Sequence, residues 1–222
     1  MNGVAYFFEI LLLVIVPAIL SFIELFHPTG FKDHVFHSLN NLQYQWLYIH
    51  YSQSFLFGLM AIAVYYLSRK TNDSVLVWLI RLNLFLFLIT YTVLDAVGGI
   101  AVGRLLTYTQ TYGINENIIN EIVQRLYNDP VIGGVNSIYS LVGSYTWLIA
   151  IALTVIFIGM ELRAHILQVV PALFLLLVSG ISLYMSHAFP YGPIAFGAFA
   201  LAGIGLLFLK KRAISSHQSF IF

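Results

Sequence analysis

Histidine and carboxylate side chains recur within or beside the long apolar segments of this chain. Glu24 and His27 lie three residues apart at the end of the first segment, so they share a helix face. His50 and Asp95 fall inside the second and third segments, and His187 follows the fifth. Ionisable groups at membrane depth are costly and usually serve a function. Imidazole and carboxylate groups together bind divalent transition metals, so these five residues predict a metal site.

The predicted ligands are His50, Asp95 and His187, with zinc as the metal. A catalytic zinc site uses three protein ligands and keeps one position open for water. Because the metal lowers the pKa of that water, hydrolysis of a lipid-like substrate is the reaction that fits. Glu24 and His27 are then the candidates for the general base or for a group that orients a ligand. The chain has no HExxH or HxxxH pair, so the prediction depends on convergence of separate helices.

Two further histidines, His34 and His37, lie in the segment FKDHVFHSL between the first two apolar segments. A polar connecting loop usually leaves histidine in solvent, so neither is predicted to bind a ligand. His165 and His217 stand alone beside basic residues, and no polar set comparable to the five residues above is predicted on their side of the membrane.

Composition predicts the architecture that must position these residues. Of the 222 residues, 60% are hydrophobic and 9% are charged, whereas a soluble domain carries about 25% charged residues. Six apolar segments reach the roughly 20 residues that span a bilayer. We therefore predict an all-α polytopic membrane bundle with one domain, 1–222. The predicted transmembrane helices cover 4–25, 42–67, 75–106, 131–159, 166–186 and 192–210.

Helix signals refine these limits. Asp129 and Pro130 resemble an N-cap and first-turn pair and are predicted to start the fourth helix. Between the third and fourth helices, apolar residues recur at helical spacing within polar sequence. Residues 114–128 are therefore predicted to form a short amphipathic helix on the membrane surface.

Periodicity assigns faces to the central helices. In the second helix one stripe runs through Gln43, Trp46, His50, Gln53 and Phe57. In the third, Asp95 shares a face with Gly99 and Gly103, whose missing side chains allow another helix to approach closely. The fourth helix is predicted to supply that partner through a small polar face that includes Asn136. His50 lies about 14 Å from the predicted start of its helix, which places it within the lipid leaflet.

Basic residues predict the orientation. Seven of the ten Lys and Arg residues fall on one side of the six-helix arrangement, and this bias favours the cytoplasm for both termini. The His and carboxylate set then faces outward.

Composition also limits the partners. The chain has no cysteine, which excludes disulfides and thiolate metal sites, and its net charge of +1 gives no basic footprint for nucleic acid. Membrane lipid is the expected partner. Two alternatives stay open: a haem-binding electron carrier with His50 as an axial ligand, and a non-catalytic subunit, assembly factor or transporter. The oligomeric state is not predicted.

Several motifs resemble those of a group of uncharacterised bacterial multi-pass membrane proteins. They are HPTG at 27–30, WLYIHYSQSFLFGLMAIAVYYL at 46–67, VLDAVGGIAVG at 93–103, NDPVIG at 128–133 and SHAFPYGPIAFGAFALAG at 186–203. The resemblance implies a multi-pass architecture and carries no activity. In site chemistry alone, the chain is also similar to ceramidase and progestin-receptor-like membrane hydrolases. Those proteins have seven helices and a paired HxxxH element that this chain lacks.

Overall fold

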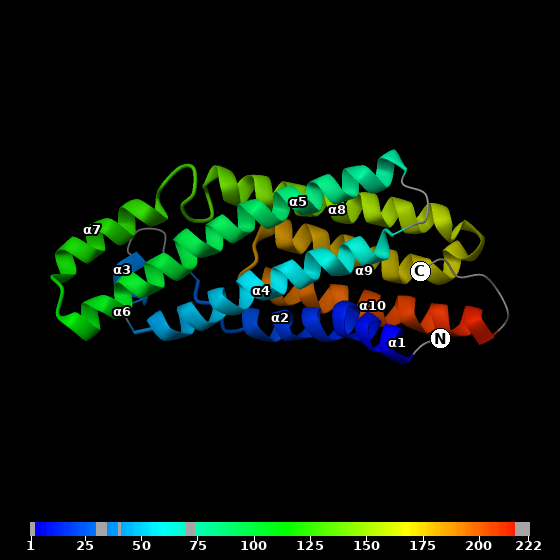
Figure 1. Ribbon diagram of the computed structural model, residues 1–222, viewed down its shortest axis with the longest axis horizontal. Coiled ribbons are helices and arrows are strands. Elements are labelled where there is room, and N and C mark those ends of the chain that lie inside the picture. The colour runs from blue at the N-terminus through cyan, green and yellow to red at the C-terminus, as the bar shows by residue number, and fades with distance from the viewer. Residues whose placement is uncertain (1–2, 30–34, 40, 70–73, 216–222) are drawn as a thin grey trace.

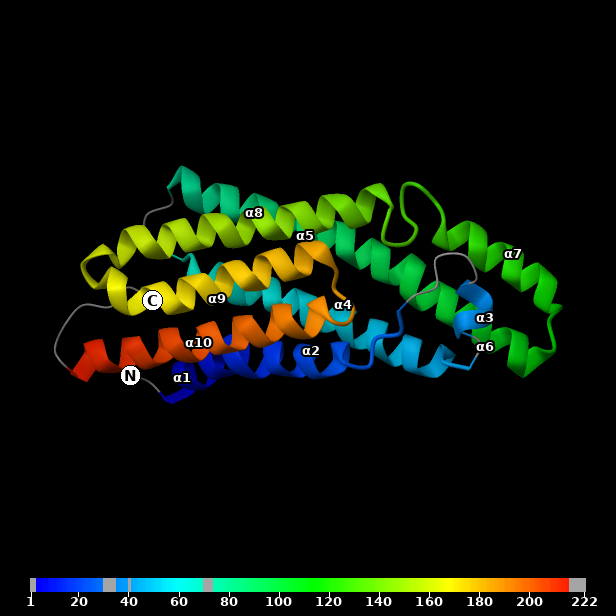
Figure 2. The ribbon, with the colours of Figure 1, turned by 180° about the vertical axis from the view of Figure 1, so that it is seen from behind.

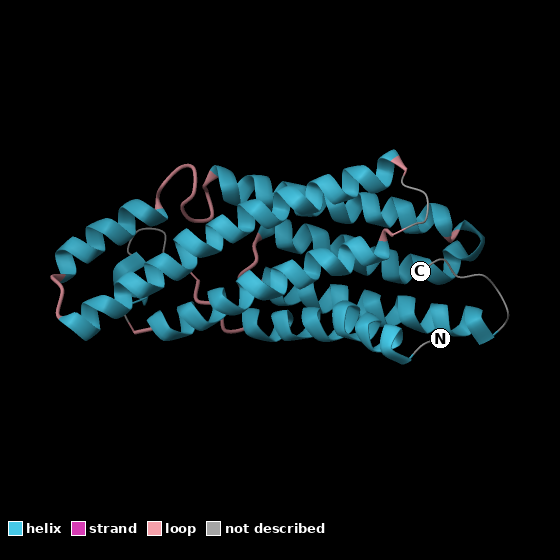
Figure 3. Ribbon diagram, in the orientation of Figure 1, coloured by secondary structure: helices cyan, strands magenta, loops and turns pink. Residues whose placement is uncertain are grey.

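The computed structural model describes residues 3–29, 35–39, 41–69 and 74–215, and every regular element within these ranges is a helix (Figure 3). The α-helices are α1 (Gly3–Ile10), α2 (Val16–Glu24), α3 (Val35–Leu39), α4 (Gln43–Leu67), α5 (Val75–Leu94), α6 (Val102–Tyr112), α7 (Glu116–Tyr127), α8 (Ile138–Glu161), α9 (Ile166–Met185) and α10 (Tyr191–Ser215). Two π-helical segments, η1 (Leu11–Ile15) and η2 (Asp95–Ala101), join α1 to α2 and α5 to α6, and a short 3-10 helix, η3 (Arg163–His165), precedes α9.

Six continuous helical runs in the described ranges are long and apolar enough to cross a membrane. This confirms the predicted all-α bundle and identifies the chain as an integral membrane protein. The runs lie side by side along the long axis, and α1 begins at the same end of the bundle at which α10 finishes (Figures 1 and 2).

The start of the fourth run differs from the prediction. α8 begins at Ile138, where the Ser137 side chain accepts a hydrogen bond from the backbone N–H of Ser140 at 3.2 Å. Asp129 Oδ1 instead accepts the backbone N–H groups of Val131 and Ile132 at 2.8 and 2.9 Å, which folds a tight turn. The predicted helix start at Asp129 and Pro130 was therefore wrong, because the carboxylate stabilises a loop rather than a helix.

Asn136 lies in that loop. Its side chain is exposed, and it precedes the first residue of α8. The predicted packing role of Asn136 on a helix face was therefore wrong, for the same reason as the helix start.

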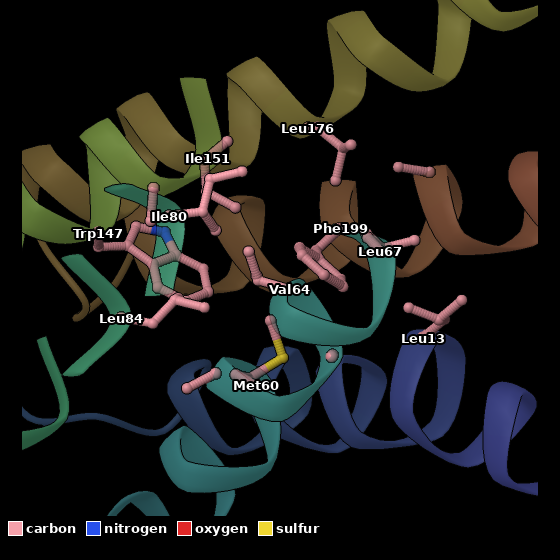
Figure 4. Close-up of a cluster of buried hydrophobic side chains, with 14 of the residues drawn as sticks. Leu13, Met60, Val64, Leu67, Ile80, Leu84, Trp147, Ile151, Leu176 and Phe199 are labelled. Atoms are coloured by element: carbon pink, nitrogen blue, oxygen red, sulfur yellow. The ribbon is translucent and has the colours of Figure 1, made fainter. Parts of the chain in front are cut away.

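The interior of the bundle is a continuous apolar cluster. All six runs contribute side chains to it. Those labelled in Figure 4 are Leu13, Met60, Val64, Leu67, Ile80, Leu84, Trp147, Ile151, Leu176 and Phe199. Lipid tails are as apolar as these side chains, so association within a membrane depends on close packing rather than on escape from water.

Glycines permit that close packing at particular crossings. A Cβ added at Gly203 would lie 2.2 Å from the backbone carbonyl oxygen of Leu13. The backbones of α10 and η1 are therefore close together at this glycine. A Cβ at Gly99 would lie 2.3 Å from His50 Cγ, and one at Gly103 would lie 2.7 Å from Leu47 Cγ. The predicted close approach at Gly99 and Gly103 thus occurs, but its partner is α4. The fourth run was the wrong partner, because its own small face at Gly143 packs against α5 instead.

One end of the molecule extends beyond the other helices. The run from Val75 to Tyr112 has 38 residues, which is about 57 Å of helix at 1.5 Å per residue, against roughly 30 Å of hydrocarbon in a bilayer. Its excess length, α6, packs with α3 and α7 into what we call the distal lobe (Figure 1). The apolar core of the lobe contains Val35, Phe36, Leu39, Trp46, Val102, Leu106, Ile119 and Val123.

α7 is the predicted amphipathic helix of residues 114–128, and the helix itself is confirmed. Its buried face is formed by Ile119 and Val123, which pack into the lobe. Ile118, from the predicted apolar stripe, is 55% exposed. The helix therefore has a second apolar face, which packs against α3 and α6, beside the exposed stripe that predicted it.

The opposite end of the bundle contains a polar network that the sequence did not predict. Glu9, in the first run, is 3% exposed, and its Oε1 accepts hydrogen bonds from Lys210 Nζ at 2.8 Å and from the Tyr66 hydroxyl. The Arg69 guanidinium stacks over the Tyr66 ring at 4.0 Å. The sequence predicted no set comparable to the histidines and carboxylates in this half, and it missed this ion pair. The missed signal was a lone glutamate in an otherwise apolar span.

Candidate functional site

Three predicted histidines meet at the boundary between the bundle and the distal lobe. The ring centroid of His27 lies 5.3 Å from that of His50 and 5.0 Å from that of His187. The three residues are 7%, 4% and 8% exposed, respectively. His27 follows the end of α2, His187 follows the end of α9, and His50 is inside α4. Chain segments distant in sequence thus bring three imidazoles together.

The length of α4 explains why a mid-helix residue meets two residues at helix ends. The first turns of α4 pack in the distal lobe through Trp46, so His50 lies level with the points where α2 and α9 stop. The sequence placed His50 within the leaflet by counting from the start of its helix. The structure puts it beside the residues that follow the ends of α2 and α9.

Hydrogen bonds fix two of these rings. His27 Nδ1 lies 2.8 Å from the carbonyl oxygen of Pro28, and His50 Nδ1 lies 3.0 Å from Asp95 Oδ1. A carbonyl oxygen only accepts, so His27 Nδ1 carries the proton and donates it. With Asp95 ionised, His50 Nδ1 donates in the same way. Nε2 of each ring therefore has a free lone pair. Both Nε2 atoms are buried without a hydrogen-bond partner.

Burial also keeps the histidines outside the spanning helices neutral. Loss of water around the ring, and next the nearby His50, lower the pKa of His27 to about 3. Burial and then the neighbouring His27 and His50 lower the pKa of His187 well below its usual range. Neutral imidazole is the form that binds metals.

Glu24 and Gln53 extend the polar set into the bundle. Both are fully buried, and Gln53 Nε2 donates to Glu24 Oε1 at 2.5 Å. The other oxygen of each side chain, and Oδ2 of Asp95, lack a hydrogen-bond partner. Buried polar atoms in folded proteins are normally paired, often with water or an ion. This concentration of unpaired atoms therefore indicates a place that binds something.

The π-helical segment η2 supplies the wall on the α5 side. It contains Asp95 and Gly99, and the Gly99 carbonyl accepts a hydrogen bond from Trp46 Nε1 at 2.8 Å. Since a side chain at Gly99 would overlap the His50 ring, this glycine is what admits the imidazole. π-Helical insertions are frequent at functional sites.

A cavity of about 650 Å³ opens above the three histidines. Its walls come from η2, from the loop between α7 and α8, and from the turn between α9 and α10. Asp129, Asn136 and Ser186 contribute polar groups, and Trp46 contributes an apolar wall. Sequence analysis missed Asp129 and Ser186 because it assigned Asp129 to a helix start and gave the turn no role.

The remaining predicted positions are less involved. Glu24 does not belong to the described lining of the cavity, so its predicted role as general base has no geometric support. His37 is exposed, as expected, and His165 lies in η3. His34 and His217 lie outside the described residues. Within the described ranges, no three His, Asp or Glu side chains are already placed to hold a metal ion.

The sequence matches no protein-family model, and no curated protein or solved structure is significantly similar to it. The resemblance to bacterial multi-pass proteins therefore stays a prediction.

Proposed function

We propose that this integral membrane protein binds a divalent metal, best zinc, through Nε2 of His27 and His50 together with the His187 ring. The observation that carries the proposal is the pair of buried, unpartnered Nε2 atoms on rings whose Nδ1 atoms are already anchored. Histidines that bind metals nearly always donate their other ring N–H to a carboxylate or a carbonyl. His27 and His50 have one of each.

Ring spacing supports the same proposal. With Zn–N bonds of about 2.1 Å and tetrahedral angles, two imidazoles on one zinc have centroids about 5 Å apart. The centroids of His27 and His50 are 5.3 Å apart, and those of His27 and His187 are 5.0 Å apart. The spacing of His27 from each of the other two rings therefore matches that of two imidazoles on one zinc.

The assignment of roles differs from the one that the sequence suggested. His27 lies between the other two histidines, so we assign it as a ligand rather than a base. Asp95 accepts from His50 Nδ1 and is assigned as the group that orients that ring. Glu24 accepts a hydrogen bond from Gln53 within the bundle, and we assign it no catalytic role.

A metal at this position would face the cavity with its fourth coordination site. Three protein ligands and one open position are the arrangement of catalytic zinc, whose bound water ionises near neutral pH. We therefore propose hydrolysis of an ester or amide bond as the reaction class, with both termini in the cytoplasm and the cavity facing outward. No observation favours haem over a smaller ion.

Metal analysis of the purified protein tests the proposal. We expect one zinc per chain in the wild type after dialysis against trace zinc, and less than a tenth of that occupancy in His27→Ala and His50→Ala. The matched control is His37→Ala, an exposed histidine, which should keep full occupancy. The alternative of a purely structural polar core predicts no zinc in any of these proteins, and that result would overturn the proposal.

A further inference from the structure

We infer that the cavity above the three histidines holds the head group of an uncharged membrane lipid from the adjacent leaflet, with an ester or amide carbonyl toward His27, His50 and His187. This inference deepens the proposed function and rests on it, since the carbonyl would meet the metal there.

The position and size of the cavity suit a lipid head group. Its volume of about 650 Å³ lies within the roughly 300–1,000 Å³ of typical small-molecule sites. It lies where α2 and α9 end and α10 begins, at the boundary of the apolar spans. A lipid head group occupies the same level of a bilayer.

The rim of the cavity is apolar and exposed, which suits the acyl chains of a lipid. Val135, Phe189 and Tyr191 line the cavity and are 46%, 53% and 40% exposed. At the membrane boundary, aromatic side chains lie among head groups and the upper acyl chains. An apolar rim at this level lets acyl chains stay in the leaflet while a head group enters the cavity.

Charge selects the class of lipid. Among the described residues that line the cavity, the charged ones are Asp95 and Asp129, and none is Lys or Arg. A phosphate group would therefore lie beside both carboxylates, with the metal at the histidines as its one counter-charge in the described lining. A cationic head group would be repelled by that metal. An uncharged head group avoids both costs and can bond to Asn136 and Ser186.

Trp46 provides a reporter inside the cavity. The chain has three tryptophans, and Trp78→Phe with Trp147→Phe leaves Trp46 alone. This protein is reconstituted in phosphatidylcholine vesicles with a few mole per cent of diacylglycerol brominated at the carboxyl end of its acyl chains. These bromines enter the cavity with the head group, and bromine quenches tryptophan on contact. We expect saturable quenching, at least threefold stronger than with bromine-labelled phosphatidic acid, and reversal by unlabelled diacylglycerol.

Two variants of this reporter protein locate the effect. Ala188→Phe fills part of the cavity and should remove the selective quenching, whereas Ala18→Phe, on the exposed face of α2, should leave it unchanged. Equal quenching by both lipids, or a failure of unlabelled diacylglycerol to reverse it, would overturn the inference even if Ala188→Phe does not fold.

Metal content measured on the same samples separates the two ideas. Bound zinc without selective quenching would overturn the lipid inference and leave the metal proposal standing. Selective quenching in protein that never binds zinc would support the lipid site and remove the metal from it.

Discussion

At the scale of single residues, the site depends on which atom of each histidine is free. His27 and His50 present Nε2 because a carbonyl and a carboxylate occupy Nδ1. The type of residue alone does not reveal this, and Asp95 illustrates the difference. It has the chemistry of a ligand, yet its contact with His50 gives it the role of holding a ring in place.

Substitution of Asp95 distinguishes these two roles. If Asp95 orients His50, Asp95→Asn keeps an oxygen acceptor for Nδ1, and the zinc dissociation constant should rise by roughly 10- to 100-fold without loss of binding. Competition with a fluorescent chelator measures the constant. Complete loss of zinc from folded Asp95→Asn, with an unchanged melting temperature, would show that the carboxylate is itself a ligand.

At the scale of elements, the contact between α4 and η2 builds the site. α4 contributes Trp46 and His50, and η2 contributes Asp95 and Gly99. The indole of Trp46 donates to the Gly99 carbonyl, and the imidazole of His50 occupies the space beside the same glycine. One missing side chain therefore determines whether the two elements can meet.

Gly99→Ala tests this contact. Its Cβ would lie 2.3 Å from His50 Cγ, so α4 and η2 must separate, at a cost of about 1–3 kcal/mol. We expect a lower melting temperature together with loss of zinc binding. The matched control is Gly58→Ala in α4, where an added Cβ has no neighbour within 4 Å. It should stabilise the protein slightly, by about 0.5–1 kcal/mol.

The sequence predicted elements better than their partners. Long apolar runs and faces such as Gln43 to Phe57 follow from periodicity, and all five residues of that stripe are buried. Which helix meets Gly99 does not follow from periodicity, because several helices carry small residues. Likewise, Asp129 has the signature of a helix start, but the glycines that follow favour a turn.

The sequence predicts only in part that His27, His50 and His187 come together. Their common end of the bundle follows from the order of the spans. Their ring contacts depend on how far α4 extends past α2, which is set by the distal lobe, and the sequence indicates no such lobe directly.

At the scale of the whole molecule, the first and last runs are joined by an ion pair across 201 residues of sequence. Glu9 and Lys210 lie at the end opposite the cavity, and both are buried. Burial removes water from both charges, which costs free energy, and removal of one partner leaves the other charge buried without a counter-charge. Its contribution is therefore best measured as a cycle.

Lys210→Leu should lower the unfolding free energy by about 3–5 kcal/mol, because Glu9 then stays buried without its cation. The double variant Glu9→Leu, Lys210→Leu should recover most of that loss, and Lys211→Leu, at an exposed position, serves as the control. Thermal unfolding in detergent measures these proteins together with Glu9→Leu, which completes the cycle. A loss in the double variant equal to the sum of the two single losses would show that the charges contribute independently.

The π-helical segment η2 has a consequence for the angular relation of the two helices that it joins. A π-turn contains one residue more than an α-turn, so α6 emerges rotated relative to the face that α5 would have continued. Deleting a single residue from η2 would restore an unbroken α-helix and swing α6 by about 100° about its axis. Leu106 would then leave the core of the distal lobe. The wide turn acts as an angular spacer that allows one helix to serve two differently oriented partners.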